Sequence, residues 1–542
     1  MDADSSSLPK AGETVAVAEP AAAPPDRPGH LVRLFGCWCP PGAASYLWAR
    51  WLFLRALGLI FFSAFYSLAF QIHGLIGPRG ILPAGDYLGL IARGYPGTRF
   101  WLAPTLLWLG SGDGALTALV AAGFVASAML ICNLWPRAAL VAALAAFLSF
   151  IAAAQDFASY QSDGMLLEAG LLSLFLAPPG LRPRLGAAHP PSWASLWLLR
   201  WEWFRIYFES GVVKLASGEP QWRDLTAMDR YYENGPLPTW IGWYAHQLPH
   251  AFHAATALLT LVVELALVWL VFLPRRCRIG VALAVTPLQI GIILTANYAF
   301  LNYLVLVLAV LLLDDRFLRR LGFRPAAACP PAPPRRWRLI AAAAVLVWVF
   351  YATVVAFLPG ILPVGRELLA PAAALEPFRV ANRYGLFAVM TRARYEIEFQ
   401  GSRDGRTWVA YPFRYKPQDV KRPPGIYAPY QPRFEWNLWF ASLASWESDP
   451  WVVSAESRLL EGEPSVLRLF AADPFHGERP AAVRTVLWQY WFTDRATRAA
   501  TGAWWRRQYL GPYAPPLDAS SVPPAAAASA PATGTSRQRH TS

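Results

Sequence analysis

The chain has 542 residues, of which 55% are hydrophobic and only 15% are charged, and its mean hydropathy is +0.30. An ordinary soluble domain carries about 25% charged residues, so this composition argues against a purely soluble enzyme, whose surface would lack charge. Lys and Arg outnumber Asp and Glu by 48 to 35, a net charge of +13. The arginines stand in short clusters between apolar runs, as in cytoplasmic loops, and not over a basic domain. The composition therefore indicates a polytopic α-helical membrane protein and not a partner of nucleic acid.

Low-complexity segments stand at both ends of the chain. Residues 1–29 are rich in Ala, Pro, Asp and Ser, and residues 516–542 are rich in Ser, Pro and Ala. Such segments cannot bury a core, so both are predicted to be disordered tails. The first tail lacks the basic and then apolar layout of a cleaved signal peptide, which makes the first spanning helix the expected anchor.

Apolar runs near the roughly 20 residues needed to cross a bilayer recur between the tails. They are 46–70, 115–135, 138–154, 165–179, 193–214, 253–273, 279–296, 299–314 and 339–359. The stretch 279–314 is either one long helix or two short ones interrupted at 297–300. With about nine transmembrane helices over 45–360, every Arg cluster falls on one side of the membrane. The positive-inside rule then places the N-terminus in the cytoplasm and the C-terminus outside.

This topology puts three sizeable segments on the outer side: 71–114, 215–252 and everything after about 360. The loop 71–114 carries Gly-Pro turn signals, and 215–252 is rich in Trp, Tyr and Pro. The C-terminal segment changes to period-two alternation. Residues 395–413 predict a β-hairpin, and Val483–Phe492 predicts another strand. We therefore expect a β-rich exoplasmic domain, a sandwich, over 375–512.

The helix at 193–214 carries the most informative charges. Glu202, Arg205 and Glu209 fall on one face at i,i+3 and i,i+4 spacing, while Arg200 and Lys214 lie on the opposite side near the membrane boundaries. Ionisable groups inside a membrane are costly and need partners or a cavity. The pattern leaves two alternatives. Either the triplet builds a polar pocket, or it is a structural ion network with Arg200 and Lys214 snorkelling to the interface.

Other polar groups are weaker candidates. Glu168 and Glu264 lie in other apolar runs and fit either the same interior or hydrogen-bonded structural positions. A metal site could use His246, His250 and His253, or Cys37 and Cys39. Pro249 interrupts the histidine segment and two ligands at one-residue spacing form a weak signal, so no metal site and no cofactor are predicted. The sequence has no phosphate-binding loop, no Gly-x-Ser-x-Gly elbow and no His-Glu-x-x-His motif.

Several stretches together resemble the lipase maturation factor family. They are FRIYFESGVVKL at 204–215, WRDLTAM at 222–228, NGPLPTW at 234–240, NYAFLNYL at 297–304, LLDD at 312–315, FRVANRYGLF at 378–387, the hairpin 395–413 and WQYWF at 488–492. The resemblance spans roughly 45–512. The motif positions that carry it are Gly211, Lys214, Trp222, Arg223, Asn297, Asn302, Asn382 and Arg383.

The resemblance implies a multi-pass membrane protein that assists the folding or assembly of secreted lipases on the lumenal side. It places the protein in the endoplasmic reticulum membrane, or in the inner membrane if the chain is bacterial, as its Ala, Arg and Pro content suggests. Client lipases and the lipid bilayer are the expected partners. We expect the β-rich domain and the loop 215–252 to present aromatic surface to clients, because exposed apolar patches mark such sites.

Two alternatives come from other functional classes. Residues 207–215, followed by Pro220 and Trp222, resemble a helix end in vitamin K-dependent carboxylase-type membrane proteins. That resemblance implies a base at Lys214, with a pKa lowered by desolvation. A transporter would instead use Glu168, Glu202, Arg205, Glu209 and Glu264, but the sequence shows no inverted repeat. The main expectation is a maturation factor that is not an enzyme.

Overall fold

A computed structural model describes residues 45–324, 336–360 and 362–518. The predicted N-terminal tail 1–29, most of the predicted C-terminal tail and Cys37 and Cys39 lie outside these residues. Residues 517–518, inside the predicted tail 516–542, form the short strand β5 (Leu517–Asp518), because Leu517 and Asp518 pair with β3 (Ala482–Phe492).

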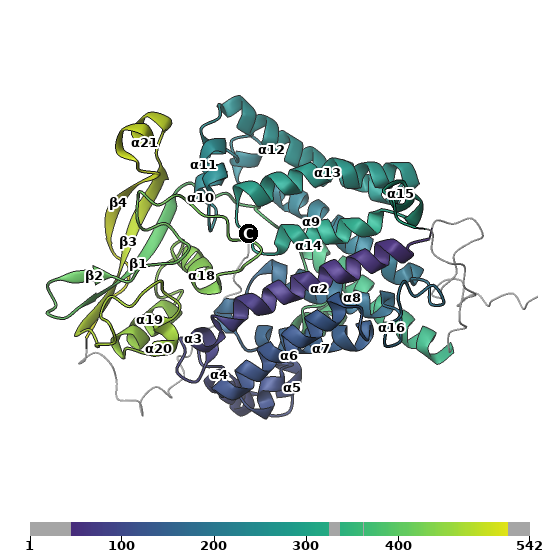
Figure 1. Cartoon of the computed structure of the whole chain (residues 1–542), viewed down its shortest axis with the longest axis horizontal. Coiled ribbons are helices and arrows are strands. Elements are labelled where there is room, and N and C mark those ends of the chain that lie inside the picture. The colour runs from purple at the N-terminus through teal and green to yellow at the C-terminus, as the bar shows by residue number, and fades with distance from the viewer. Residues whose placement is uncertain (1–44, 325–335, 361, 519–542) are drawn as a thin grey trace, which may run out of the picture.

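Every predicted apolar run contains a helix, and these helices form one bundle (Figure 1). They are α2 (Leu47–Ala69), α6 (Asp113–Ile131), α7 (Pro136–Ile151), α8 (Gln161–Leu176), α9 (Trp193–Ala216), α12 (His250–Leu265, continued by a 3₁₀ turn Leu267–Phe272), α13 (Arg275–Thr295), α14 (Leu301–Ala309, continued by Val310–Leu312) and α16 (Arg336–Phe357). Among the described helices, five are long and apolar enough to cross a membrane: α2, α6, α12 with its extension, α13 and α16.

The stretch 279–314, for which the sequence allowed either one long helix or two short ones, consists of two helices. Helix α13 ends at Thr295 and α14 begins at Leu301. Between them, Ala296 pairs with Pro238 in an isolated β-bridge, and Ala299 has a positive φ of 49°. The chain cannot continue as a helix through such a conformation.

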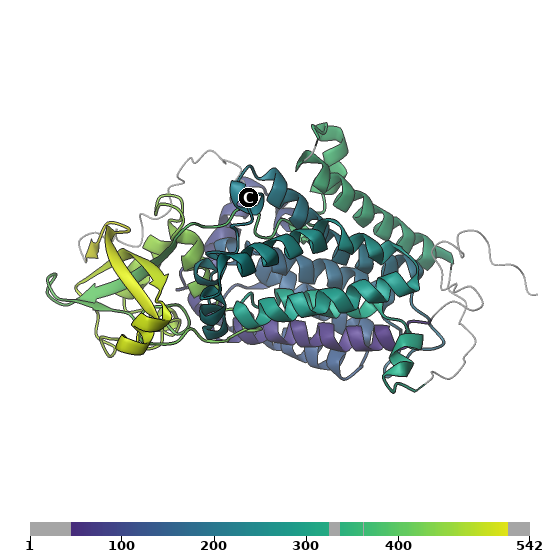
Figure 2. The same cartoon turned by 90° about the horizontal axis from the view of Figure 1, so that it is seen from above.

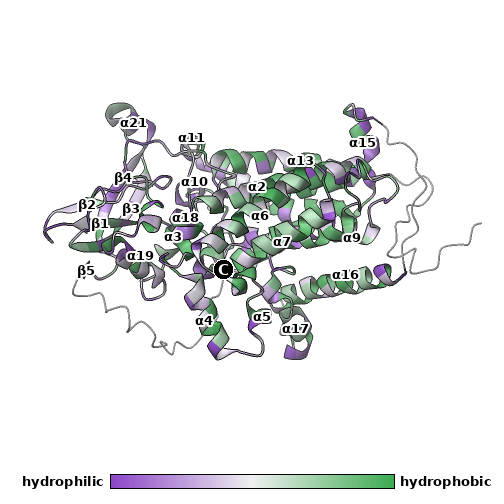
Figure 3. Ribbon diagram, turned by 60° about the horizontal axis from the view of Figure 1, so that its bottom comes forward, coloured by the Kyte–Doolittle hydropathy of each residue, from purple (hydrophilic) through white to green (hydrophobic). Residues whose placement is uncertain are grey.

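The bundle helices expose much of their apolar surface. Within the most apolar 18-residue windows of α12, α13 and α16, only 22%, 28% and 28% of residues are buried inside the protein. Figure 3 shows the hydrophobic colour concentrated on the bundle, including α13 and α16, whereas the colour of the sheet region is mixed. A helix that is apolar on its outer face needs lipid and not water around it, which agrees with an integral membrane protein.

Two ends of the bundle differ in character. At one end, Arg278 contacts Tyr46, the carboxylate of Asp314 pairs with Arg275, and Asp315 at the start of α15 (Asp315–Arg320) holds the start of α2. The opposite end meets the C-terminal domain (Figures 1 and 2). The connecting elements α3 (Ile72–Ile76), α10 (Tyr231–Asn234) and α11 (Trp240–His246) lie between bundle and domain. Further short helices are α4 (Ala84–Gly94), α5 (Arg99–Leu102) and α17 (Arg366–Ala373).

The C-terminal domain contains an antiparallel sheet in the order β2-β1-β3-β4, with β5 beside β3. The remaining strands are β1 (Arg394–Ser402), β2 (Trp408–Ala410) and β4 (Trp505–Pro512). The predicted hairpin is confirmed, since Ser402 pairs with Trp408, and so is the strand at 483–492. Asp404 closes the hairpin turn by accepting hydrogen bonds from the backbone of Arg406 and Thr407.

The predicted sandwich is wrong for the residues that the structure describes, because they form one sheet. Helices α18 (Arg433–Ala441), α19 (Trp451–Leu460) and α20 (Pro464–Leu467) occupy the chain between β2 and β3, and α21 (Arg495–Thr501) joins β3 to β4. Phe399 of β1 packs against Phe434 of α18, with ring centroids 6.2 Å apart, and against Phe470. Alternation in the sequence shows that a strand face is covered, but a helix covers it as well as a second sheet does.

Packing of α2 against α6 provides a test of the bundle. A Cβ added to Gly123 of α6 would lie 2.2–2.4 Å from the ring of Phe65, whereas one added to Gly114 of the same helix meets nothing within 4 Å. We expect Gly123→Ala to cost about 1–3 kcal/mol of stability through overpacking, despite the better helix propensity of Ala. Gly114→Ala is the matched control and leaves stability unchanged or higher.

Thermal unfolding of the detergent-purified full chain measures both variants. Equal melting temperatures for Gly123→Ala and the wild type would contradict the described contact between α2 and α6.

Candidate functional site

The charged face predicted on α9 is buried at the centre of the molecule. Glu202, Arg205, Glu209 and Lys214 are each no more than 1% exposed. Their partners come from α8, from α12 and from the segment 379–387, which follows α17 and precedes the sheet domain. Three parts of the chain that are far apart in sequence therefore meet around α9.

The first contact set is centred on Arg205. Its guanidinium forms an ion pair with Glu168 of α8, and Nη1 lies 3.8 Å from Oε1 of Glu209 one turn along α9. Glu202 is buried beside Glu168, Arg205 and Tyr384. The triplet on α9 thus meets Glu168, one of the two acids that the sequence placed in other helices.

The segment 379–387 enters the bundle beside this cluster. Asn382 donates from its backbone N and from Nδ2 to Oε2 of Glu168, both at 3.1 Å, and its carbonyl accepts from Nη1 of Arg205 at 2.7 Å. The backbone N of Tyr384 donates to Oε2 of Glu209 at 2.7 Å, and its hydroxyl donates to Oε2 of Glu168 at 3.0 Å. The family-like stretch at 378–387 is therefore a set of donors and acceptors for the buried charges of α8 and α9.

Lys214 forms the second contact set. Its Nζ donates to Oε1 of Glu264 on α12 and to the carbonyl of Leu386, both at 2.8 Å, and it lies 5.0 Å from the centre of the Trp222 ring. The indole Nε1 of Trp222 donates to the carbonyl of Phe387 at 2.9 Å. Lys214 is thus ion-paired and enclosed at this position.

Gly211 permits the Lys214–Glu264 contact. A Cβ on Gly211 would lie 2.9 Å from Cβ of Glu264 and from Cδ2 of Leu265. Only a glycine lets α9 and α12 approach this closely, so the Gly211 and Lys214 motif positions belong to one helix–helix contact.

The snorkelling interpretation of Arg200 and Lys214 is wrong. Arg200 is 4% exposed, donates to the carbonyl of Leu311 at 3.1 and 2.9 Å, and stacks 4.7 Å from the centre of the Tyr46 ring. The side chain is long enough to reach either the interface or a neighbouring helix, and sequence position alone does not choose between them. Lys214 is ion-paired with Glu264, whereas a backbone carbonyl and an aromatic ring hold Arg200.

The remaining motif residues have different environments. Nδ2 of Asn297 donates to the carbonyl of Gly425 at 2.9 Å, and its Oδ1 accepts from the backbone N of Tyr427 and Ala428. This amide fastens the break between α13 and α14 to the C-terminal domain. Nδ2 of Asn302 donates to Gln289 at 2.7 Å. Arg223 donates to the carbonyl of Leu215 at 2.6 Å, and Arg383 is exposed.

The three histidines do not converge on one point. His250 pairs with Asp229 at 2.9 Å, His246 lies 3.9 Å from Glu233, and His253 is buried with its ring 5.6 Å from that of Tyr232. Within the described part of the chain, no group of three or more His, Cys, Asp or Glu residues is placed to hold a metal ion.

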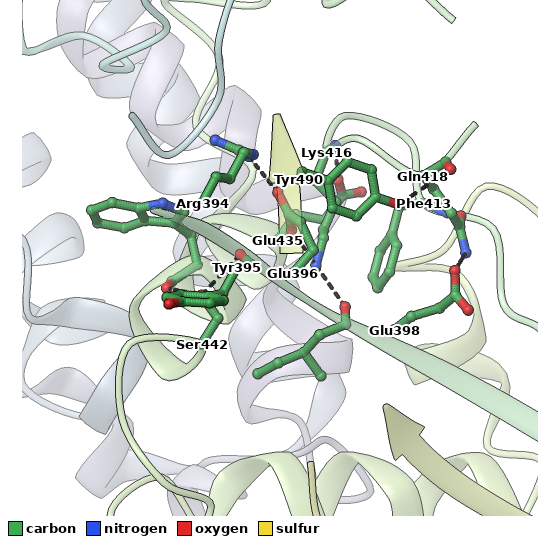
Figure 4. Close-up of polar contacts among 12 residues, drawn as sticks. Arg394, Tyr395, Glu396, Glu398, Phe413, Lys416, Gln418, Glu435, Ser442 and Tyr490 are labelled. Carbon is green, nitrogen blue, oxygen red and sulfur yellow. Dashed lines mark hydrogen bonds and ion pairs between the residues drawn. The ribbon is translucent and has the colours of Figure 1, made fainter. Parts of the chain in front are cut away.

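A buried ionic cluster in the C-terminal domain was missed by sequence reasoning (Figure 4). Arg394 pairs with Glu396 on the same strand and donates to the carbonyls of Glu233 and Pro236, each at 3.0 Å. Nζ of Lys416 forms an ion pair with Oε2 of Glu396 at 2.7 Å and donates a hydrogen bond to the carbonyl of Ile397 at 2.7 Å. The sequence does contain a signal for this cluster: Arg394, Glu396 and Glu398 alternate along the strand, which places opposite charges on one strand face.

One further contact joins the domain to the bundle, and another fixes a loop within the domain. Arg433 of α18 forms a bidentate pair with Asp163 of α8, with two N–O distances of 2.7 Å. Glu435 of the same helix accepts hydrogen bonds from the backbone N of residues 414–416 at 2.9, 2.8 and 2.6 Å. Burial raises the pKa of Glu435 to about 7 although these hydrogen bonds oppose it. At the predicted cluster Arg205 is paired with Glu168 and Lys214 with Glu264, whereas the buried carboxylate of Glu202 accepts no hydrogen bond from the described residues.

Comparison with known proteins gives consistent matches over both parts of the chain. A family model described as lipase maturation factor transmembrane domain matches residues 48–320, and one described as lipase maturation factor C-terminal domain matches residues 380–515. Lipase maturation factor 2 of Gallus gallus is 34% identical, covering 86% of this chain and 81% of the relative. Lipase maturation factor 1 of Bos taurus is 33% identical, covering 88% of this chain and 90% of the relative. Lipase maturation factor 2 of Homo sapiens is 33% identical, covering 86% of this chain and 82% of the relative. No solved structure matches the chain significantly.

The Lys214–Glu264 pair separates a structural role from a catalytic one. We expect Lys214→Met alone to destabilise the protein by about 3–5 kcal/mol, because it leaves Glu264 buried without its cation. Lys214→Met with Glu264→Leu removes both charges at similar volume and is expected to stay close to wild-type stability. Thermal unfolding of the purified protein and the yield of active secreted lipase measure the two effects.

A double variant that folds normally but gives no active lipase would contradict the structural role, since a base at Lys214 would then be required.

Proposed function

Because this chain belongs to the lipase maturation factor family, we propose that it assists the folding or assembly of secreted lipases on the exoplasmic side of a membrane. The observation that carries the proposal is the joint match of the bundle and the C-terminal domain to this family. By family, the membrane is that of the endoplasmic reticulum.

The proposed orientation places the N-terminus in the cytoplasm, nine helices across the bilayer and the sheet domain in the lumen. Its support is the distribution of charge. Arg275 and Arg278 of α13 make contacts at the end of the bundle where α2 begins, and helix α15, which also carries arginines, lies at the same end. The sheet domain meets the other end. Arg-rich ends face the cytoplasm under the positive-inside rule.

The proposed mechanism is non-covalent. The five cysteines of the sequence are at 37, 39, 132, 277 and 329, so the C-terminal domain at 375–512 has no thiol to exchange. Aromatic and aliphatic side chains on the outer side are exposed instead, among them Trp240 and Tyr244 of α11 and Phe440 of α18. Apolar groups held at a surface bind the unpacked apolar segments of a folding client.

Lipase output from a cell that lacks its own lipase maturation factor tests the proposal. The chain is expressed there together with a secreted lipase. We expect it to raise the specific activity of the lipase in the medium, because maturation changes the fraction of folded lipase and not only its amount. Lipase activity divided by lipase mass is the measurement.

The double variant Trp240→Ala and Tyr244→Ala is expected to lower this specific activity at unchanged expression. Leu109→Ala is the matched control, since Leu109 is an exposed apolar residue in the other outer loop, 71–114. Unchanged lipase specific activity with the wild-type chain present at normal level would contradict the proposed function.

A further inference from the structure

A cavity of about 570 Å³ lies where the outer end of α2 meets the C-terminal domain. Its walls are mainly aromatic, and come from α2, from α18 and from the loop between β2 and α18: Tyr66, Phe70, Tyr415, Tyr427, Tyr430 and Phe434. The volume falls within the roughly 300–1,000 Å³ typical of small-molecule sites in proteins. None of the residues considered for the proposed function lies in this cavity.

The wall formed by α2 continues an apolar stripe on the outside of that helix. Leu59, Phe62, Tyr66 and Phe70 are 56%, 39%, 47% and 59% exposed, and their spacing of three, four and four residues places them on one helix face. Helix α2 is long and apolar enough to cross a membrane. The stripe therefore faces lipid along the helix and leads into the cavity at the outer end, where Tyr66 and Phe70 belong to both.

The rim of the cavity carries two arginines. Arg414 and Arg468 line it and are exposed, and Nη2 of Arg414 donates to the carbonyl of Arg468 at 3.2 Å, which holds the two residues together. Glu435 is the acidic residue in the cavity lining, and its carboxylate already accepts hydrogen bonds from the backbone N–H groups of residues 414–416. The guanidinium groups are left to attract an anion, as basic pockets do beside membrane headgroups.

We propose that this cavity binds an anionic membrane lipid, with an acyl chain against the aromatic walls and the headgroup anion at Arg414 and Arg468. The continuity of the apolar stripe with the cavity favours a ligand that arrives from the bilayer over a peptide that arrives from the lumen. Apolar walls and a cationic rim match the two ends of such a lipid.

Photo-crosslinking tests the proposal on the purified full chain in nanodiscs. The probes are phosphatidylglycerol and phosphatidylcholine that carry a diazirine in one acyl chain, and mass spectrometry locates the labelled residues. We expect phosphatidylglycerol to label the cavity walls, and phosphatidylcholine to label them several-fold less. Arg414→Gln with Arg468→Gln is expected to weaken phosphatidylglycerol labelling roughly tenfold or more, since each basic residue contributes about 1 kcal/mol near a headgroup.

The matched control is Arg406→Gln with Arg479→Gln, two exposed arginines of the same domain that do not line the cavity. Its labelling should equal that of the wild type. Ile426→Trp narrows the cavity from an exposed lining position while it keeps both arginines, and should also lower labelling if the arginine variant fails to fold.

Labelling of the cavity that is equal for the two lipids and unaffected by the arginine and Ile426 variants would overturn the proposal. The proposal would also be overturned if neither lipid labelled the cavity and the cavity residues were instead crosslinked to an unfolded protein probe, reduced and carboxymethylated lactalbumin. Because these readouts use the purified protein without a lipase, they are independent of the test of the proposed function.

Discussion

The charges buried on α9 have to be neutralised, and this requirement determines how distant parts of the chain pack together. A buried ion that loses its partner costs several kcal/mol, so Arg205 and Lys214 can be buried only where counter-charges and carbonyls are supplied. Glu168 comes from α8, Glu264 from α12, and the carbonyls of Asn382 and Leu386 from the segment that leads into the sheet domain. The bundle therefore depends on a part of the chain more than 160 residues downstream of α9.

The same constraint fixes the C-terminal domain to the bundle. Segment 379–387 is held inside the bundle, Arg433 is paired with Asp163, and Asn297 holds the loop that contains Gly425. A surface held at several points loses little conformational entropy when it contacts a client, which suits a factor that acts through non-covalent contacts. Four of the ionisable groups that suggested membrane-embedded chemistry contact segment 379–387: Glu168, Arg205, Glu209 and Lys214.

Local patterns predicted the local structure. Apolar runs predicted the helices, the break at 297–300 was one of two stated alternatives, and period-two alternation predicted the hairpin and the strand at 483–492. Partners across the fold could not be predicted. Helical spacing grouped Glu202, Arg205 and Glu209 on one face, but no local signal indicates that Tyr384 donates to Glu209. The burial of Glu396 also depends on segments distant in sequence. The same holds for the choice of helices, and not a second sheet, to cover the strands.

We expect segment 379–387 to stay in the bundle while the protein acts on its client. A Cβ on Gly385 would lie 3.9 Å from Cβ of Val213, within the range of a disulfide. Val213→Cys and Gly385→Cys, with the five native cysteines replaced, should therefore crosslink readily. We expect the oxidised protein to support secretion of active lipase as well as the reduced protein does. Failure to crosslink, or lipase output that is lost on oxidation and restored by reductant, would contradict this expectation.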